Sequence, residues 1–194
     1  ALKLKTTLKF NKQYVDNAES ADSWLANTDS ALGGIVKTLQ RARDLAVTAS
    51  NSGTLTQTEL NNIKQEVQQS KAHLIEIGNK SFGDRYIFNG TKTKTKPFEN
   101  ATTTNLSDYE ANGSISTNKM EREIQRGSTV KMNITSDQVG QNGLKQMFVD
   151  MQKFVDGLDN ENYNKIENAI GNIDKHIEGT LKARAQVGAR QQRL

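Results

Sequence analysis

The sequence contains no cysteine and a single proline, Pro97. Without cysteine the chain has no disulfide, no cysteine-ligated zinc or iron–sulfur site and no thiol nucleophile. No apolar run approaches the length of a membrane span, so no membrane partner is expected. Leu, Ile, Val and Phe together number only 42 of the 194 residues, which is near the lower limit for a packed globular core. This composition disfavours a large single-core enzyme and favours an elongated shape.

Motifs for catalysis and cofactor binding are also missing. The sequence has no Gly-x-x-x-x-Gly-Lys phosphate loop and no nucleophile elbow. The two histidines, His73 and His176, each lack a second metal ligand four residues on, and we expect both at the surface. We therefore expect no catalytic residue, no metal and no cofactor, and a protein that is not an enzyme.

The net charge of +4 is spread along the chain rather than gathered in one segment. A nucleic-acid-binding protein usually concentrates basic charge on one face or element. The best candidate patch is a lysine cluster near the start of the chain, which we interpret as a solvated helix face: Lys3, Lys5, Lys9 and Lys12. No nucleic-acid partner is expected.

Residues 1–50 carry the strongest pattern in the sequence. Two series spaced by seven residues, one from Leu4 and one from Thr7, are mostly apolar, which is typical of a coiled-coil seam. Trp24 lies beside this seam, either as a packing residue or as an anchor for another subunit. Gly33 and Gly34 lie inside the helix and mark a soft spot or a close contact with another backbone. The seam residues of this helix include Leu25, Leu32, Ile35 and Leu39.

A second helix is predicted from about residue 57 to residue 79. Thr56 and Glu59 have the spacing of a capping box, in which each side chain accepts a backbone N–H of the other residue. The apolar positions again follow heptad spacing, so the first two helices should form an antiparallel hairpin. The seam residues of this helix are Leu60, Ile63, Val67, Leu74 and Ile77.

The hydrophobic period changes from helix-like to strand-like after residue 80. Tyr86 and Phe88 alternate with other residues, and Asn89-Gly90 is a strong hairpin-turn signal. Residues 91–96 alternate Thr and Lys and are predicted to form an edge strand, whose lysines prevent further pairing. The sequence therefore predicts a β-hairpin over residues 81–92.

Residues 91–140 are polar, and we expect a small β-rich insert that lies apart from the helical seam. Short β signals occur at 113–124 and 129–134, with a turn at Gly127-Ser128 between them. A third helical region is predicted over 144–158, with a pause at 157–160 before it resumes to residue 194. Its apolar stripe includes Ile170, Ile173 and Ile177.

The predicted fold class is α+β: an elongated antiparallel helical rod, coiled-coil-like, with three long helical segments, a β-hairpin and a small β-rich insert. The rod domain is discontinuous and comprises residues 1–90 and 141–194; the insert domain comprises residues 91–140. Both ends of the sequence lie inside helical patterns, so we expect a fragment whose terminal helices are cut at the same end of the rod.

Three segments resemble bacterial flagellins. Residues 40–47 (QRARDLAV) resemble a stretch of the long first helix, residues 78–90 the hairpin after the second helix, and residues 183–190 (ARAQVGAR) a stretch of the C-terminal helix. Within this family the hairpin is similar to that of the hook-associated protein 3 subfamily, as are residues 129–139, while Gly140 departs from the usual aromatic. The hairpin residues that carry the resemblance are Phe82, Tyr86, Phe88, Gly90, Pro97 and Phe98.

The resemblance implies a structural subunit that forms a ring at the hook–filament junction of the bacterial flagellum. Its implied partners are hook-associated protein 1, flagellin, neighbouring copies of itself and a flagellar export chaperone. It also implies an extracellular location, reached through the flagellar type III export apparatus. Two alternatives are a flagellin filament subunit and, in a different class, a basic coiled-coil nucleic-acid-binding protein.

The resemblance also suggests a contact site on the first two helices. In some flagellins an arginine, a leucine and a glutamate contact the vertebrate innate receptor for flagellin, and motif matching places Arg41, Leu45 and Glu66 at those positions. Arg41 and Leu45 are four residues apart and are expected to share a helix face. The stronger interpretation is that the three residues serve subunit packing.

Overall fold

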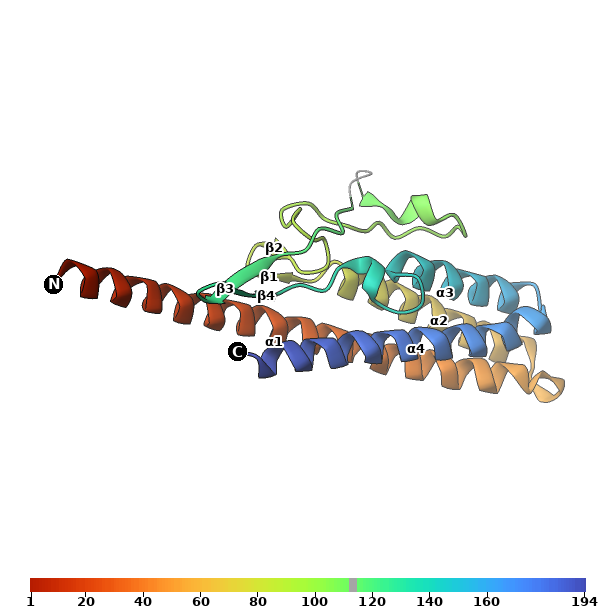
Figure 1. Ribbon diagram of the computed structural model, residues 1–194. Coiled ribbons are helices and arrows are strands. Elements are labelled where there is room, and N and C mark those ends of the chain that lie inside the picture. The colour runs from red at the N-terminus through yellow and green to blue at the C-terminus, as the bar shows by residue number, and fades with distance from the viewer. Residues whose placement is uncertain (112–114) are drawn as a thin grey trace.

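The computed structural model describes residues 1–111 and 115–194 and shows an elongated bundle of helices (Figure 1). Helix α1 (Leu2–Ser50) packs against α2 (Gln57–Gly78) and α4 (Tyr163–Gln192), and α3 (Leu144–Asp159) packs against α2 and α4. Successive helices run in opposite directions, and both termini lie toward the same end of the bundle. The predicted α+β rod is confirmed, and its third helical segment consists of two helices.

Polar pairs between α1 and α4 fix the antiparallel register of these two helices. Near the end where α1 finishes, Arg43 Nε lies 2.5 Å from Asp174 Oδ1. Nearer the termini, Arg184 Nε donates to Asp29 Oδ1 over 2.9 Å, and Gln191 Nε2 donates to Asp22 Oδ1 over 3.3 Å. The described part of α4 therefore ends at the level of Asp22, and the first 20 residues of α1 project beyond it.

The heptad seam of α1 is buried only where other helices cover it. Leu25, Leu32, Ile35 and Leu39 are fully buried. The same heptad series begins at Leu4, but Leu4 is 67% exposed because no helix of the described chain lies over it. The seam prediction is thus correct from Ala21 onward, and the earlier part of α1 presents its apolar side chains to solvent.

Helix α2 begins and packs as its sequence predicts. Thr56 Oγ1 accepts the Glu59 N–H over 3.2 Å, and Glu59 Oε2 accepts the Thr56 N–H over 2.7 Å, so the capping box is formed. At its other end, Gly78 lies under Phe98, where an added Cβ would come 3.0 Å from that ring. The five predicted seam residues are all buried: Leu60, Ile63, Val67, Leu74 and Ile77.

The predicted pause in the third region is a reversal of chain direction between α3 and α4. Helix α4 then begins at a cap in which Asn162 Oδ1 accepts the Lys165 N–H over 3.2 Å. Ile173 is 2% exposed, while Ile170 and Ile177 are partly buried at the edge of the core. The stripe therefore marks the correct face of α4, with its two flanking isoleucines nearer to solvent.

The hairpin exists, but its turn differs from the predicted one. Strand β1 (Ser81–Phe82) pairs antiparallel with β2 (Arg85–Tyr86), and the chain turns at Gly83, whose φ is +65°. The predicted turn at Asn89-Gly90 does not join the two strands. Gly90 still has a positive φ of +55°, and a Cβ there would lie 2.6 Å from Ser116 Oγ.

The edge strand predicted over residues 91–96 is wrong, because this segment forms turns. Asn89 explains the difference: its Nδ2 donates to the carbonyl oxygens of Lys92, over 3.2 Å, and Thr95, over 2.9 Å. These bonds hold the segment in a compact bend, in which the Thr93 carbonyl accepts from β2, through the Tyr86 N–H over 2.7 Å.

The insert holds one further strand pair among the described residues, β3 (Glu121–Gln125) with β4 (Ser128–Lys131). Part of the first β signal, residues 112–114, lies outside the described residues, and residues 115–120 are not a strand. Short 3-10 turns occur elsewhere: η1 (Ser52–Thr54), η2 (Leu106–Tyr109) and η4 (Ser136–Gln138). The insert is thus poorer in strands than expected, because its polar side chains bond to nearby backbone groups instead.

The expectation that the insert lies apart from the helical seam is wrong. Phe98 and Tyr109 are fully buried against Phe148 of α3, with ring centroids 5.2 and 5.7 Å away. Val130 of β4 and Met132, which follows that strand, are also fully buried, and they belong to the same continuous core as the helices. The division into rod and insert domains stays a prediction.

Candidate assembly surfaces

The projecting part of α1 carries half of the large hydrophobic residues that are exposed in the described part of the chain. Its exposed residues are Leu2 at 82%, Leu4 at 67%, Leu8 at 60%, Phe10 at 56% and Val15 at 55%. Leu4, Leu8 and Val15 share one side of the helix, and exposed apolar side chains grouped in this way usually mark an interaction site. We call this surface, residues 2–15 of α1, the projecting face.

A cavity borders the projecting face where the β3–β4 hairpin approaches α1. It has a volume of about 470 Å³ and is lined by Thr7, Phe10, Asn11 and Tyr14 of α1 and by Glu123 and Arg126 of the hairpin. The Asn17 side chain anchors the hairpin here, because its Nδ2 donates to the Glu123 carbonyl over 2.8 Å. Aromatic walls with charged groups at the rim suit a protein side chain from another subunit.

The β1–β2 hairpin, which carries the family resemblance, is a packing element. Phe82 makes an edge contact with Trp24, with ring centroids 6.1 Å apart, and the Arg85 guanidinium lies 4.8 Å from the Trp24 ring. Trp24 is fully buried, so the packing interpretation is correct and the subunit-anchor interpretation is wrong. Its Nε1 has no hydrogen-bond partner among the described residues.

The remaining hairpin residues fix the chain as it leaves the helices. Phe88, Pro97 and Phe98 are buried, while Tyr86 is half-buried. The Asn79 side chain clamps Phe98 on both sides: its Oδ1 accepts the Phe98 N–H and its Nδ2 donates to the Phe98 carbonyl, each over 2.9 Å. These residues therefore shape the joint between helices and insert.

The structure brings together two of the three residues proposed as a receptor contact. Arg41 Nε and Nη2 lie 2.9 and 2.6 Å from Glu66 Oε1, beside a cavity of about 430 Å³ between α1 and α2. Leu45 is only 5% exposed, whereas Arg41 is exposed, so the two residues differ in accessibility although they are four residues apart. The four-residue spacing rotates Leu45 far enough to join the core.

The two histidines have different environments. His73 is exposed, as expected, with Nδ1 3.6 Å from Glu76 Oε2. The surface expectation for His176 is wrong: it is 1% exposed, its Nδ1 accepts the Gln141 N–H over 2.9 Å and its Nε2 lies 2.7 Å from Asp150 Oδ2. Within the described residues, no group of three or more His, Cys, Asp or Glu side chains is placed to hold a metal ion.

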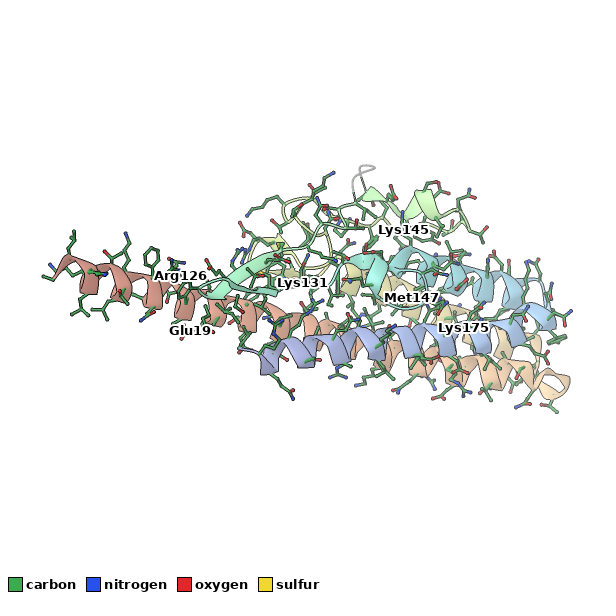
Figure 2. The ribbon with its side chains drawn as sticks, in the orientation of Figure 1. Glu19, Arg126, Lys131, Lys145, Met147 and Lys175 are labelled. Carbon is green, nitrogen blue, oxygen red and sulfur yellow. The ribbon has the colours of Figure 1, made fainter. Side chains whose placement is uncertain are left out.

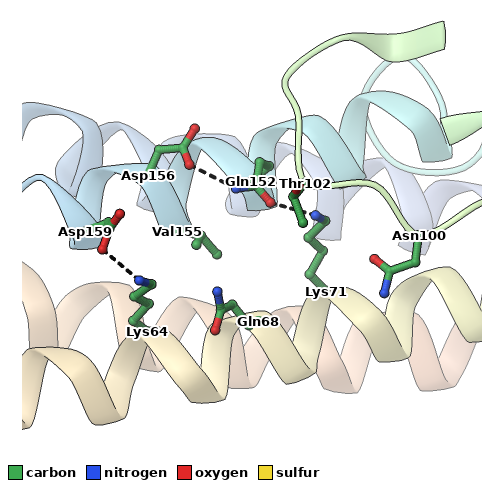
Figure 3. A pocket seen from close by; sticks show the side chains of 9 residues that line it. All are labelled: Lys64, Gln68, Lys71, Asn100, Thr102, Gln152, Val155, Asp156 and Asp159. Carbon is green, nitrogen blue, oxygen red and sulfur yellow. Dashed lines mark hydrogen bonds and ion pairs between the residues drawn. The ribbon is translucent and has the colours of Figure 1, made fainter. Parts of the chain in front are cut away.

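A buried lysine between α2 and α3 was not anticipated from the sequence (Figure 3). Lys71 is 4% exposed; its Nζ donates to Gln152 Oε1 over 2.6 Å and to the Ala101 carbonyl, and lies 5.2 Å from the Tyr109 ring centre. Burial lowers the pKa of Lys71 to about 8, although the Asp156 carboxylate acts in the opposite direction. The contacts join the insert to both helices.

Burial also shifts the pKa of Tyr109, which lies beside Lys71. Burial, reinforced by the Asp156 and Asp108 carboxylates, raises the pKa of the Tyr109 hydroxyl to about 12. That hydroxyl donates to the Thr103 carbonyl over 2.8 Å. The arrangement is suited to fastening the insert and offers neither a nucleophile paired with a base nor a preformed oxyanion site.

The first half of the chain is similar to the N-terminal helical region of bacterial flagellins. The model for that region, the bacterial flagellin N-terminal helical region, matches residues 1–93. The matched residues include α1, α2 and the β1–β2 hairpin. This match supports the resemblance to bacterial flagellins that the sequence indicates over these residues.

The similarity extends to flagellar hook-associated protein 3. The Salmonella typhimurium protein of that name is 31% identical over 93 residues, which are 47% of this chain and 29% of that protein. The matched stretch therefore spans less than a third of the length of this relative.

Solved structures share the fold over nearly the whole chain. Hook-associated protein 3 from Legionella pneumophila has a TM-score of 0.85 at 16% identity, covering 100% of this chain and 92% of that one. FlgL from Bacillus cereus has a TM-score of 0.79 at 18% identity, covering 98% and 89%. FliC from Burkholderia pseudomallei is less similar, with a TM-score of 0.53 at 16% identity, covering 90% and 100%.

Proposed function

We propose that this chain is the rod and insert of a structural subunit at the hook–filament junction of the bacterial flagellum. Copies would form a ring between hook-associated protein 1 and the first layer of flagellin. The fold similarity to hook-associated protein 3, stronger than that to FliC, supports the junction over the filament alternative.

The projecting face is the observation that carries this proposal. From Ala21 onward α1 is enclosed by its own chain, whereas Leu2, Leu4, Leu8 and Phe10 remain more than half exposed. Apolar side chains that stay in contact with water contribute no burial energy. They stabilise this part of α1 only when other helices cover them. A subunit that packs beside identical and related rods supplies that cover.

The remaining partners follow from this role. Before assembly, an exposed apolar helix needs protection, which supports a dedicated export chaperone as a partner. The location is extracellular, after passage through the flagellar export apparatus. Among the residues described, none of the helices has the length and apolar character needed to cross a membrane.

For Arg41, Leu45 and Glu66 we propose a packing role. Leu45 contributes to the α1–α2 core and the Arg41–Glu66 pair closes its rim. If this is correct, the unmodified chain will show no detectable binding to the vertebrate receptor for flagellin. Saturable binding that is lost in Arg41→Ala would instead support a receptor contact.

The nucleic-acid alternative makes a different prediction, which is retention on duplex DNA at low salt, falling steeply as salt is raised. Arg41, Arg43 and Arg184 pair with carboxylates of neighbouring helices, and the remaining basic charge is spread along the chain. We therefore expect no retention.

Deletion of the gene in the source bacterium tests the junction role. We expect cells that assemble hooks but release flagellin into the medium, because the adaptor between hook and filament is missing. The full-length gene should restore filaments. A deletion strain that keeps normal filaments would contradict the proposal.

A further inference from the structure

Four cations gather where the β3–β4 hairpin meets the end of α4. Lys119 and Lys131 are exposed, and Lys131 is the last residue of β4. Arg190 Nη1 donates to the Asn133 carbonyl over 2.7 Å, and Arg193 Nη2 donates to the Thr129 carbonyl over 3.4 Å, so both arginines lie on the hairpin. We call this cluster of Lys119, Lys131, Arg190 and Arg193 the basic surface.

The cations of the basic surface are close to one another without a carboxylate between them. The neighbouring Lys119 lowers the pKa of Lys131 through its charge, and the Arg190 charge acts in the same direction, while the Glu121 carboxylate acts in the opposite one. Glu121 is the cross-strand neighbour of Lys131, but it forms no ion pair with any of the four within the described ranges, 1–111 and 115–194. By contrast, Arg43, Arg184 and Lys64 each pair with an aspartate.

An exposed acidic face lies at the same level of the rod on the other side of α1. Asp16 and Glu19 are three residues apart, both are exposed, and neither forms an ion pair with a residue that the structure describes. Asn17 points the other way, toward the hairpin, where it bonds to Glu123. Figure 2 shows Glu19 on the side of α1 away from the hairpin that carries Arg126 and Lys131.

We propose that the basic surface of one copy binds the Asp16–Glu19 face of a neighbouring copy. The inference rests on the proposed function, in which copies lie side by side. Because the two faces are at the same height but on different sides of the rod, the contact joins rods laterally. It is heterologous, with different patches on the two partners, and repetition of such a contact generates a ring when the rotation closes.

The contact gives a reason for holding like charges together on this surface. Opposite charges brought in by a neighbour would remove the repulsion between Lys119 and Lys131. Exposed ion pairs are weak and are screened by salt. We therefore expect this contact to set the arrangement of subunits that are also held together by other surfaces. In dilute solution the contact should be dissociated.

Cysteine cross-linking can test the contact directly, because the chain has no cysteine of its own. Ser23→Cys places a thiol one turn after Glu19, and Thr129→Cys places one beside Lys131 on the exposed strand face. Neither change removes a charge. The two single variants, one carrying a mass tag, are mixed at high protein concentration and oxidised, and the tagged heterodimer is measured on a non-reducing gel.

We expect the Ser23→Cys and Thr129→Cys mixture to give more tagged heterodimer than a control mixture. In the control, Gln65→Cys, at an exposed position on α2, replaces Ser23→Cys. Adding Lys131→Glu to the Thr129→Cys chain should lower the yield about threefold or more. Adding Glu19→Lys to the Ser23→Cys chain should then restore it. Salt at about 0.5 M should reduce the wild-type yield.

Equal yields in the test and control mixtures, or no response to charge reversal and its compensation, would overturn the proposed contact. Such a failure leaves the junction role standing, because that role is judged by filament assembly in the deletion strain. If the deletion strain keeps normal filaments, the proposed ring is wrong. Any cross-linking between the two faces would then reflect a different self-association.

Discussion

At the scale of single residues, the contact between α4 and the loop before α3 depends on two glycines. Gly140 has a φ of +71°, and a Cβ there would lie 2.8 Å from His176 Nδ1. A Cβ on Gly179 would overlap the Gly140 backbone carbonyl, which cannot move as a flexible side chain can. The departure at Gly140 from the aromatic usual in the related subfamily therefore has a steric reason in this chain.

Gly179→Ala should lower the free energy of unfolding by about 1–3 kcal/mol, as overpacked cores usually do. Gly171→Ala is the matched control in the same helix, because a Cβ there meets nothing within 4 Å. It should stabilise the helix by up to about 1 kcal/mol. Urea unfolding followed by circular dichroism measures both; a neutral Gly179→Ala would mean that the loop is not seated on α4.

Lys71 makes a prediction about pH. Its folded pKa is about 8, below the 10.5 of an ordinary lysine, so the folded chain binds this proton less tightly than the unfolded chain. Stability should therefore rise as pH increases from about 8 toward 10.5, by about 1–2 kcal/mol near pH 9.5. Tyr109 acts oppositely only above pH 10, because its pKa is raised to about 12.

The free energy of unfolding at pH 7.5 and 9.5, compared between the wild type and Lys71→Met, checks this prediction. The difference between the two proteins should shift in favour of the wild type as pH rises. Lys175→Met, at an exposed position on α4, controls for general effects of removing a lysine. A pH-independent difference would indicate that Lys71 keeps an ordinary proton affinity in the fold.

At the scale of elements, α1 has a covered part and an uncovered part with the same heptad pattern. Leu32 and Leu4 occupy the same heptad position, yet Leu32 is fully buried and Leu4 is 67% exposed. Leu32→Ala should therefore cost about 2–5 kcal/mol of stability. Leu4→Ala should change it by less than about 0.5 kcal/mol, and chemical denaturation of both variants provides the measurement. Similar losses in both would mean that the isolated chain buries its projecting face.

The insert is part of the rod's core, and its removal should destabilise the helices. Replacing residues 100–138 with a short linker removes Tyr109, Val130 and Met132, all fully buried. Thermal unfolding of the helical circular dichroism signal should then begin well below that of the intact chain. An unchanged transition would show that the helices are held together without these contacts.

Local patterns predicted the elements well, because their causes lie within a few residues. The Thr56–Glu59 capping box and the seam from Leu25 to Leu39 required only spacing along the helix. The turn at Gly83 was missed because Asn89-Gly90 is the stronger turn signal. In the structure the Asn89 side chain instead holds a separate bend after the hairpin.

Tertiary features were beyond such patterns. His176 is buried because its partners, Gln141 and Asp150, come from 35 and 26 residues away. Lys71 likewise meets Gln152, which is 81 residues away. No local signal in the sequence specifies these pairs, and the same holds for the basic surface, whose members come from the insert and from the end of α4.

At the scale of the whole molecule, the chain is a covered bundle that continues as a single exposed helix. The bundle fixes the register of α1 and α4 through pairs such as Arg184–Asp29 and seats the insert along one side. The projecting face and the cavity beside Phe10 then lie together at the end where both termini are found. This arrangement suits a subunit that is complete only among neighbours.

The position of the protein along intact flagella tests the central claim most directly. Antibodies raised against this chain and detected with gold particles should label one short zone per flagellum, where the hook meets the filament, in electron micrographs of isolated flagella. Pre-absorption with the purified chain should remove the label. Gold distributed along the entire filament would contradict the junction role and would identify the chain as a filament subunit.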